Sequence, residues 1–206
     1  MIHKKGDVIG ISGVTISTGI DLGQQNASNT RSLIDKYIKD NGNPDNVDVN
    51  ALMKELQPYF GLQKQKAVDA LNKKALNITS AEATLLEQSF GYATQTQVAK
   101  QFDENNTKGM VFEKLPEEAQ TVIVDFAYQY GLSDSKGSVR QTFWKYAYDG
   151  DWEKLSTWLK SNPDIYISRR EREGNLLKNG IDTKSLPESG NPCAQSGTST
   201  SSSNGQ

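Results

Sequence analysis

Ser12-Gly13-Val14-Thr15-Ile16-Ser17-Thr18-Gly19-Ile20-Asp21-Leu22-Gly23, close to the start of the chain, is its most informative segment. Glycines, hydroxyl residues and one acid alternate there with Val14, Ile16 and Ile20, and this alternation is typical of a strand. Glycine inside a strand indicates a bend or a close backbone approach, so over about residues 7–22 we expect short strands broken by the glycines at 10, 13, 19 and 23, in a small curled sheet. Asp21 is poorly placed for burial in such a sheet and well placed to face a cleft.

Beyond this segment the apolar residues recur at helical spacing. A capping box, Thr79-Ser80-Ala81-Glu82, predicts the start of a long helix, because the hydroxyl and the glutamate can satisfy each other's backbone amides. Glycines at 42, 131 and 180 are expected to follow helix ends. Apolar spacing predicts helices over about 33–38, 49–56, 66–76, 81–103, 119–130, 143–146, 152–159 and 167–178.

These elements predict an α+β fold that is mainly α, with a small N-terminal β element and a helical C-terminal lobe. We expect residues 1–78 to form the N-terminal lobe and residues 79–103 a helix between the lobes. Residues 104–184 should form the C-terminal lobe. Residues 185–206 should be a disordered tail, since Ser, Thr, Gly, Asn and Gln dominate it and cannot bury enough surface to fold.

Composition excludes several classes of function. The 206 residues carry a net charge of -2, which gives no electrostatic footprint for nucleic acid. No apolar run approaches the ~20 residues of a membrane span, and the basic start, with His3, lacks the apolar stretch of a signal peptide. With Cys193 as the one cysteine, we expect neither a disulfide nor a metal site. No phosphate-binding loop is present, so we expect no cofactor. We also expect the chain to be a monomer.

The order of these parts resembles the phage-type lysozymes, and most closely the pesticin-type bacterial toxins. The segment Ser12–Gly23 is similar to that family's active-site β segment almost residue for residue. Phe126-Ala127-Tyr128-Gln129-Tyr130-Gly131 resembles its core helix, and Trp144 to Trp158 followed by Arg169-Arg170-Glu171-Arg172-Glu173 resembles its last helices. The resemblance covers roughly Val8 to Asp182.

The resemblance implies a muramidase, a glycoside hydrolase that cleaves the β-1,4 bond between N-acetylmuramic acid and N-acetylglucosamine in peptidoglycan. By motif position, Asp21 and Thr15 would hold and polarise the attacking water. Six residues separate them, and we expect both side chains on one face of a regular strand. Tyr128, Gln129 and Arg169 would contact the glycan. The expected place of action is the periplasm or cell wall of a target bacterium, reached without a signal peptide, and an immunity protein is a possible partner.

The chain departs from the family where the general acid should be. The family's glutamate precedes the β segment, but the eleven residues before Ser12 include Asp7 and no glutamate. Three explanations stay open: the chain is a fragment, another chain supplies the missing helix, or the domain has lost catalysis and kept peptidoglycan binding. The alternative to an active muramidase is thus an inactive or truncated glycan-binding domain. A structural domain of a phage or secretion particle is a third class.

Each candidate residue also has a plainer interpretation. Asp21 could be a turn acid that caps the backbone near Gly19 and Gly23. Arg169 could belong to a solvated charged helix face, or bind water or another acid if the catalytic glutamate is absent. Tyr128 could pack in the core. The tryptophans at 144, 152 and 158 fall at helical spacing, which favours core positions over sugar stacking.

Overall fold

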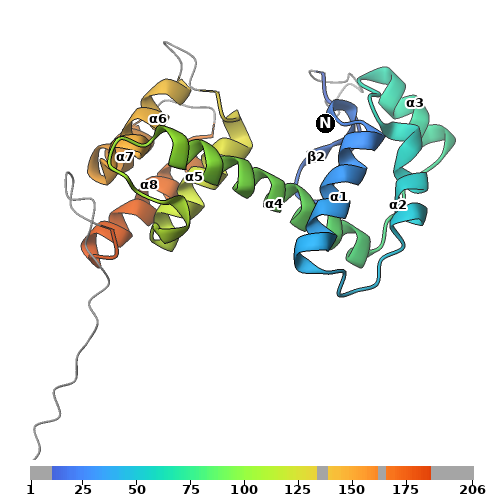
Figure 1. Cartoon of the computed structure of the whole chain (residues 1–206). Helices are drawn as coiled ribbons and strands as arrows, with labels where there is room; N and C mark the ends of the chain where they lie inside the picture. Colours follow the sequence, from blue (N-terminus) through green and yellow to red (C-terminus); the bar gives the residue numbers. More distant parts are fainter. Residues whose placement is uncertain (1–10, 134–138, 162–165, 187–206) are drawn as a thin grey trace, which may run out of the picture. The chain divides into compact units, whose positions relative to one another are not determined.

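The computed structural model of the chain describes residues 11–133, 139–161 and 166–186, and confirms a mainly α fold with a small N-terminal sheet (Figure 1). The chain divides into two compact units, Met1–Ala93 and Thr94–Gln206, and the division falls within the long helix α4 (Ser80–Asn105). The expectations for His3, Asp7, Cys193 and residues 187–206 lie outside the described residues.

The first unit begins with a hairpin of two short strands, β1 (Thr15–Ile16) and β2 (Ile20–Asp21), which pair antiparallel. The turn between them closes through Gly19 N–H, which donates to Ile16 O at 3.1 Å, and Gly19 has a φ of 123°. The predicted break of the strand at a glycine is confirmed at Gly19, whereas the expectation that Thr15 and Asp21 lie on one regular strand was wrong. The chain reverses at this turn because glycine adopts a backbone conformation that other residues rarely do.

Between the hairpin and α4, the described residues form three helices and two short 3-10 turns. They are η1 (Leu22–Gln24), α1 (Ala27–Asn41), α2 (Val49–Leu56), η2 (Gln57–Tyr59) and α3 (Gln65–Lys73). Helix α1 ends at Gly42, as its sequence predicts, with the Gly42 N–H donating to Ile38 O at 2.8 Å. Helix α3 ends at Lys73, short of the predicted Leu76.

The alternation in the β element sorts its side chains between core and surface. Val14, Ile20 and Leu22 are buried, whereas Thr15 is exposed and Asp21 is half-buried. The buried side chains join a hydrophobic cluster with residues from α1, α2, η2, α3 and α4, namely Ile34, Leu52, Leu56, Tyr59, Ala67, Leu85 and Leu86. Burial of one face thus fixes which face of the hairpin points outward.

The predicted capping box at the start of α4 is confirmed. Glu82 Oε2 accepts from Thr79 N–H at 2.7 Å, and Glu82 N–H donates to Thr79 Oγ1 at 3.2 Å. Two tyrosine hydroxyls also tie the first unit's part of α4 to α1. Tyr37 Oη donates to Gln88 Oε1, and Tyr92 Oη donates to Asp40 Oδ2, each at 2.9 Å.

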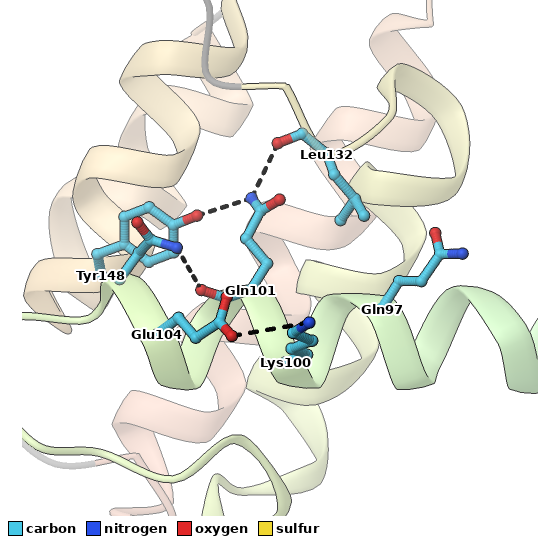
Figure 2. A pocket seen from close by; sticks show the side chains of 7 residues that line it. Gln97, Lys100, Gln101, Glu104, Leu132 and Tyr148 are labelled. Atoms are coloured by element: carbon cyan, nitrogen blue, oxygen red, sulfur yellow. Dashed lines mark hydrogen bonds and ion pairs between the residues drawn. The ribbon is translucent and has the colours of Figure 1, made fainter.

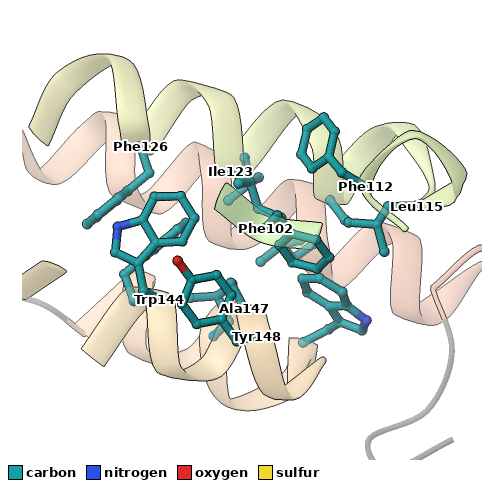
Figure 3. Packing of buried hydrophobic residues seen from close by; sticks show 14 of the residues in the cluster. Phe102, Phe112, Leu115, Ile123, Phe126, Trp144, Ala147 and Tyr148 are labelled. Carbon is teal, nitrogen blue, oxygen red and sulfur yellow. The ribbon is translucent and has the colours of Figure 1, made fainter. Parts of the chain in front are cut away.

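The second unit packs η3 (Phe112–Lys114), α5 (Glu117–Tyr130), α6 (Val139–Asp149), α7 (Trp152–Ser161) and α8 (Ile167–Asp182) around an aromatic core (Figure 3). Phe126 stacks on Phe143 with ring centroids 3.6 Å apart, and Trp144 stacks on Tyr148 at 5.4 Å. Trp144 and Trp152 are buried, as predicted, and Trp158 packs against the same cluster.

Helix α8 runs past Gly180, where the sequence predicted its end. Gly180 is buried inside the helix because the chain folds back over it: Leu186 N–H donates to Gly180 O at 3.0 Å. A Cβ at position 180 would lie 2.8 Å from Leu186 Cδ1. Gly180 therefore serves close packing rather than termination. Leu186, inside the range 185–206 expected to be a tail, is 2% exposed.

Among the described residues, no helix has the length and apolar character needed to cross a membrane.

Candidate active site

Thr15 and Asp21 lie directly opposite each other across the hairpin. They are register partners in the antiparallel pair, next to the partners Ile16 and Ile20. Directly opposite residues project their side chains from the same face, with Cβ atoms about 4.5–5.5 Å apart. The two predicted residues are thus brought together on the outward face, by strand pairing rather than by spacing along one strand.

One carboxylate oxygen of Asp21 is held by two backbone amides. Gly13 N–H donates to Asp21 Oδ1 at 2.9 Å, and Gly23 N–H donates to the same atom at 2.8 Å. The second contact is also the N-cap bond of η1. With Oδ1 fixed at two points, the carboxylate plane has little freedom to rotate.

The two glycines are required because their backbones cross. A Cβ on Gly23 would lie 2.6 Å from Leu62 O and 2.8 Å from Gly13 Cα. A Cβ on Gly13 would likewise lie 2.6 Å from Gly23 Cα. Real Cβ atoms do not approach backbone atoms that closely. Only glycine therefore fits both positions where the two backbone segments cross beside Asp21.

The second carboxylate oxygen of Asp21, Oδ2, is available to bind a water molecule. Among the described residues, no hydrogen bond is made to Asp21 Oδ2. The exposed Thr15 hydroxyl lies across the hairpin on the same face. A carboxylate oxygen and a hydroxyl on directly opposite residues of a hairpin can hold one water molecule between them. The same contacts also show that Asp21 caps turn backbone, as the plainer interpretation expected, although at Gly13 and Gly23 rather than at Gly19.

The other predicted contacts lie in the second unit, where Gln129 and Arg169 are bonded to each other. Arg169 Nη1 donates to Gln129 Oε1 at 2.9 Å. Arg169 also makes a two-point ion pair with Asp125 of α5, through Nη2 to Oδ1 and through Nε to Oδ2 at 2.8 Å. Tyr128, on the same helix, is 42% exposed. Arg169 is therefore bound to an acid of α5 rather than lying on a solvated charged helix face.

Asp125 was not a predicted site residue, and its contacts shift its pKa. Burial opposes its ionisation, but hydrogen bonds from Arg169 and Glu173 outweigh burial and lower its pKa to about 2. The i, i+4 spacing of Asp125 and Gln129 on α5 was the available signal, since it places both on the helix face that Arg169 meets. The sequence alone does not show which face of α5 is covered by α8.

Behind this ion pair lies a second arginine, Arg170, which is fully buried. Its Nη2 is 2.6 Å from Glu173 Oε1, and its guanidinium lies 5.1 Å from the Phe126 ring centroid and 5.3 Å from that of Tyr130. Burial is the main cause that raises the pKa of Glu173 to about 9, and the neighbouring Asp125 raises it further while Arg170 opposes. Glu173 is 5% exposed, so it is a core acid rather than a catalyst that meets substrate.

The raised pKa of Glu173 predicts that stability falls as pH rises. Below its ordinary pKa of 4.5 both folded and unfolded chains hold the proton; above it, only the folded chain does, until pH reaches about 9. One such proton changes the free energy of unfolding by about 1.4 kcal/mol per pH unit. Glu173→Gln fixes the neutral form. Between pH 5 and pH 8, the free energy of unfolding of wild type should therefore fall by about 2 kcal/mol or more relative to that of Glu173→Gln. Urea unfolding followed by tryptophan fluorescence measures this difference.

Glu171→Gln, at an exposed position of the same helix, is the matched control and should keep the wild-type pH dependence. Parallel stability curves for wild type and Glu173→Gln would show instead that Glu173 is already ionised beside Arg170. Asp125 acts in the opposite direction: its contribution is present above pH 3.8 and is lost as pH falls towards 2.

A polar pocket of about 350 Å³ lies in the second unit, beside the C-terminal half of α4 (Figure 2). Its polar groups bond one another: Gln101 Nε2 donates to Leu132 O at 2.8 Å and to Tyr148 Oη at 2.7 Å. The lining drawn from the described residues contains none of the five predicted site residues. Within the same described ranges, no group of three or more His, Cys, Asp or Glu could hold a metal ion.

Comparison with known proteins identifies the family. The family model Pesticin, described as "Bacterial toxin homologue of phage lysozyme, C-term", matches residues 2–153. The match includes Thr15, Asp21, Tyr128 and Gln129 but ends before Arg169, so it stops short of the Asp182 to which the resemblance extends. No curated protein matches the chain. Since residues 2–153 are more than half of the chain, this protein belongs to the pesticin family of phage-lysozyme-like bacterial toxin domains.

Proposed function

We propose that the chain is a muramidase that hydrolyses the β-1,4 bond between N-acetylmuramic acid and N-acetylglucosamine of peptidoglycan. The observation that carries the proposal is the pairing of Thr15 with Asp21 on the outward face of the hairpin, with Asp21 Oδ1 clasped by two amides. The family match supports it, because the match covers both residues and describes a phage lysozyme homologue.

In the proposed reaction, Asp21 and Thr15 orient one water molecule for attack on the anomeric carbon. Asp21 Oδ2 accepts a proton from this water as its oxygen bonds to the carbon, and the glycosidic carbon–oxygen bond breaks. The leaving oxygen must take a proton from a general acid. Glycoside hydrolysis ordinarily uses a second carboxyl group for this step, and in the family that this chain resembles a glutamate preceding the β segment donates that proton.

Tyr128, Gln129 and Arg169 are proposed to contact the glycan. Tyr128 presents an exposed aromatic ring of the kind that stacks on sugars. Gln129 and Arg169 present a fixed row of amide and guanidinium groups, because each is held by the other and Arg169 also by Asp125. The proposed place of action is the wall or periplasm of a target bacterium, with an immunity protein as a possible partner of a monomeric toxin domain.

A glycan-binding domain without activity is the second candidate. One observation favours it: the bonds to Asp21 Oδ1 give this acid a structural role of its own. Such a domain would keep the folded hairpin and the polar groups of α5 while having no proton donor for the leaving group.

Two assays on the same preparation separate these candidates. The chain is mixed with insoluble peptidoglycan and sedimented, and it is added to permeabilised bacterial cells whose turbidity is followed. The proposal predicts both sedimentation with peptidoglycan and clearing of the cells. Binding without clearing would support the inactive domain, and failure of both would favour a structural domain without glycan affinity.

A further inference from the structure

The segment Gly61–Lys64, between η2 and α3, lies against the crossing of Gly13 and Gly23. Leu62 O is in contact with both glycines, close enough that a Cβ on Gly23 would lie 2.6 Å from it. The segment is itself anchored in the core of the first unit, since Tyr59 is fully buried before it and its hydroxyl donates to Lys74 O at 2.6 Å. It is therefore a fixed surface behind the crossing.

Two backbone amides of this segment bond to the peptide groups that hold Asp21. Lys64 N–H donates at 3.0 Å to Ser12 O, the carbonyl of the peptide whose N–H, on Gly13, donates to Asp21 Oδ1. Gly61 N–H donates at 3.0 Å to Leu22 O, the carbonyl of the peptide whose N–H is on Gly23. Each peptide group that donates to the carboxylate is thus also held at its carbonyl oxygen, by a backbone amide of Gly61–Lys64. Bonds linked in series polarise one another, which strengthens the final contact to the carboxylate.

Gln63 adds a side-chain contact to the same arrangement. Its Nε2 donates at 3.1 Å to Gly23 O, on the residue that carries one of the two amides. The side chain is half-buried, so this bond is shielded from water. Gln63 is also the part of the segment that a substitution can remove without changing the backbone.

We propose that Gly61–Lys64 positions the Asp21 carboxylate, with Gln63 as a positioning residue that acts through Gly23. This inference rests on the proposed function of Asp21 for its kinetic consequence, but the structural claim stands on the contacts above. Gly61–Lys64 holds the two peptide groups whose N–H groups are on Gly13 and Gly23. These N–H groups hold Asp21 Oδ1, and the position of Oδ1 determines the direction of Oδ2. The Asp21 carboxylate orients the attacking water, and its displacement by a fraction of an ångström slows the chemical step more than it weakens substrate binding.

Gln63→Ala tests this proposal, with Gln65→Ala as the matched control. Gln65 is exposed and its side chain bonds to Asp69 on the surface of α3, so its loss should change nothing at the crossing. In Gln63→Ala we expect the amides of Gly13 and Gly23 to exchange with solvent at least about fivefold faster in hydrogen-exchange NMR, while buried amides of α2 keep their rates. The turnover number kcat on peptidoglycan should fall about tenfold with KM unchanged.

The outcomes separate this inference from the proposed function. Unchanged exchange at Gly13 and Gly23 in Gln63→Ala would overturn the positioning role, whether or not the chain is active. Faster exchange at all amides alike would also overturn it, since that result marks general destabilisation. Selective exchange together with full activity of an Asp21→Asn variant would overturn the proposed function and leave the positioning of the carboxylate intact.

Discussion

Asp21→Asn is expected to reduce lysis of permeabilised cells by about 10²–10³-fold while leaving the fold intact. Asparagine keeps an Oδ1 acceptor for the amides of Gly13 and Gly23, so the clasp at the crossing survives. It replaces Oδ2 by an amide that can neither carry negative charge nor accept the proton of an attacking water. The thermal midpoint of unfolding should therefore change little while the turbidity rate collapses.

Asp21→Ala separates the structural from the chemical role of this residue. Alanine also removes the Oδ1 acceptor, and each half-buried amide left without a partner costs about 1–3 kcal/mol. We expect the alanine variant to be both inactive and clearly less stable than the asparagine variant. Asp45→Asn, at an exposed position, is the control for loss of one charge and should lyse like wild type. Wild-type lysis by Asp21→Asn would show that Asp21 is a turn acid alone.

Gly23→Ala is expected to destabilise the chain by about 3 kcal/mol or more, which is the largest stability effect that we predict for a single methyl group. The added Cβ would lie 2.6 Å from Leu62 O and 2.8 Å from Gly13 Cα. Both neighbours are backbone atoms, which cannot rotate away as a side chain can. The crossing must therefore open, and with it the clasp on Asp21. Urea unfolding measured by circular dichroism gives the loss directly.

Gly91→Ala is the matched control and should have the opposite sign. Gly91 lies within α4, where an added Cβ would meet no heavy atom of the described residues within 4 Å, leaving aside the helix's own nearby backbone. Alanine there should stabilise the helix by about 0.5–1 kcal/mol, because it restricts the unfolded chain more than glycine does. Equal stability of Gly23→Ala and Gly91→Ala would contradict the crossing of Gly13 and Gly23.

Local chemistry explains why much of the fold could be predicted from the sequence. The capping box at Thr79 and Glu82 marks the start of α4 through contacts within four residues. Helix α1 ends at Gly42, and α5 ends at Gly131, because a residue with positive φ can close a helix there. The apolar spacing around Phe126 and Trp144 identified the core helices of the second unit. Each of these signals depends on neighbours in the sequence.

The sequence predicted that Thr15 and Asp21 act together, but not how they meet, because their pairing needs a chain reversal at Gly19 rather than one regular strand. The other contacts of the candidate site join residues far apart in sequence, and the sequence did not predict them. The support from Gly61–Lys64 comes from about forty residues away, through backbone groups that carry no side-chain signal. Likewise, Arg169 finds Asp125 only once α8 has packed on α5.

The most direct test of the central claim, that Asp21 activates the water that cleaves peptidoglycan, identifies the sugar ends released by the chain. Purified peptidoglycan is digested with wild type or with Asp21→Asn, reduced with borohydride and analysed by mass spectrometry. The account predicts new reduced N-acetylmuramic acid ends with wild type, formed at least about 100-fold faster than with Asp21→Asn. Equal rates for the two proteins, or no new N-acetylmuramic acid ends with wild type, would contradict it.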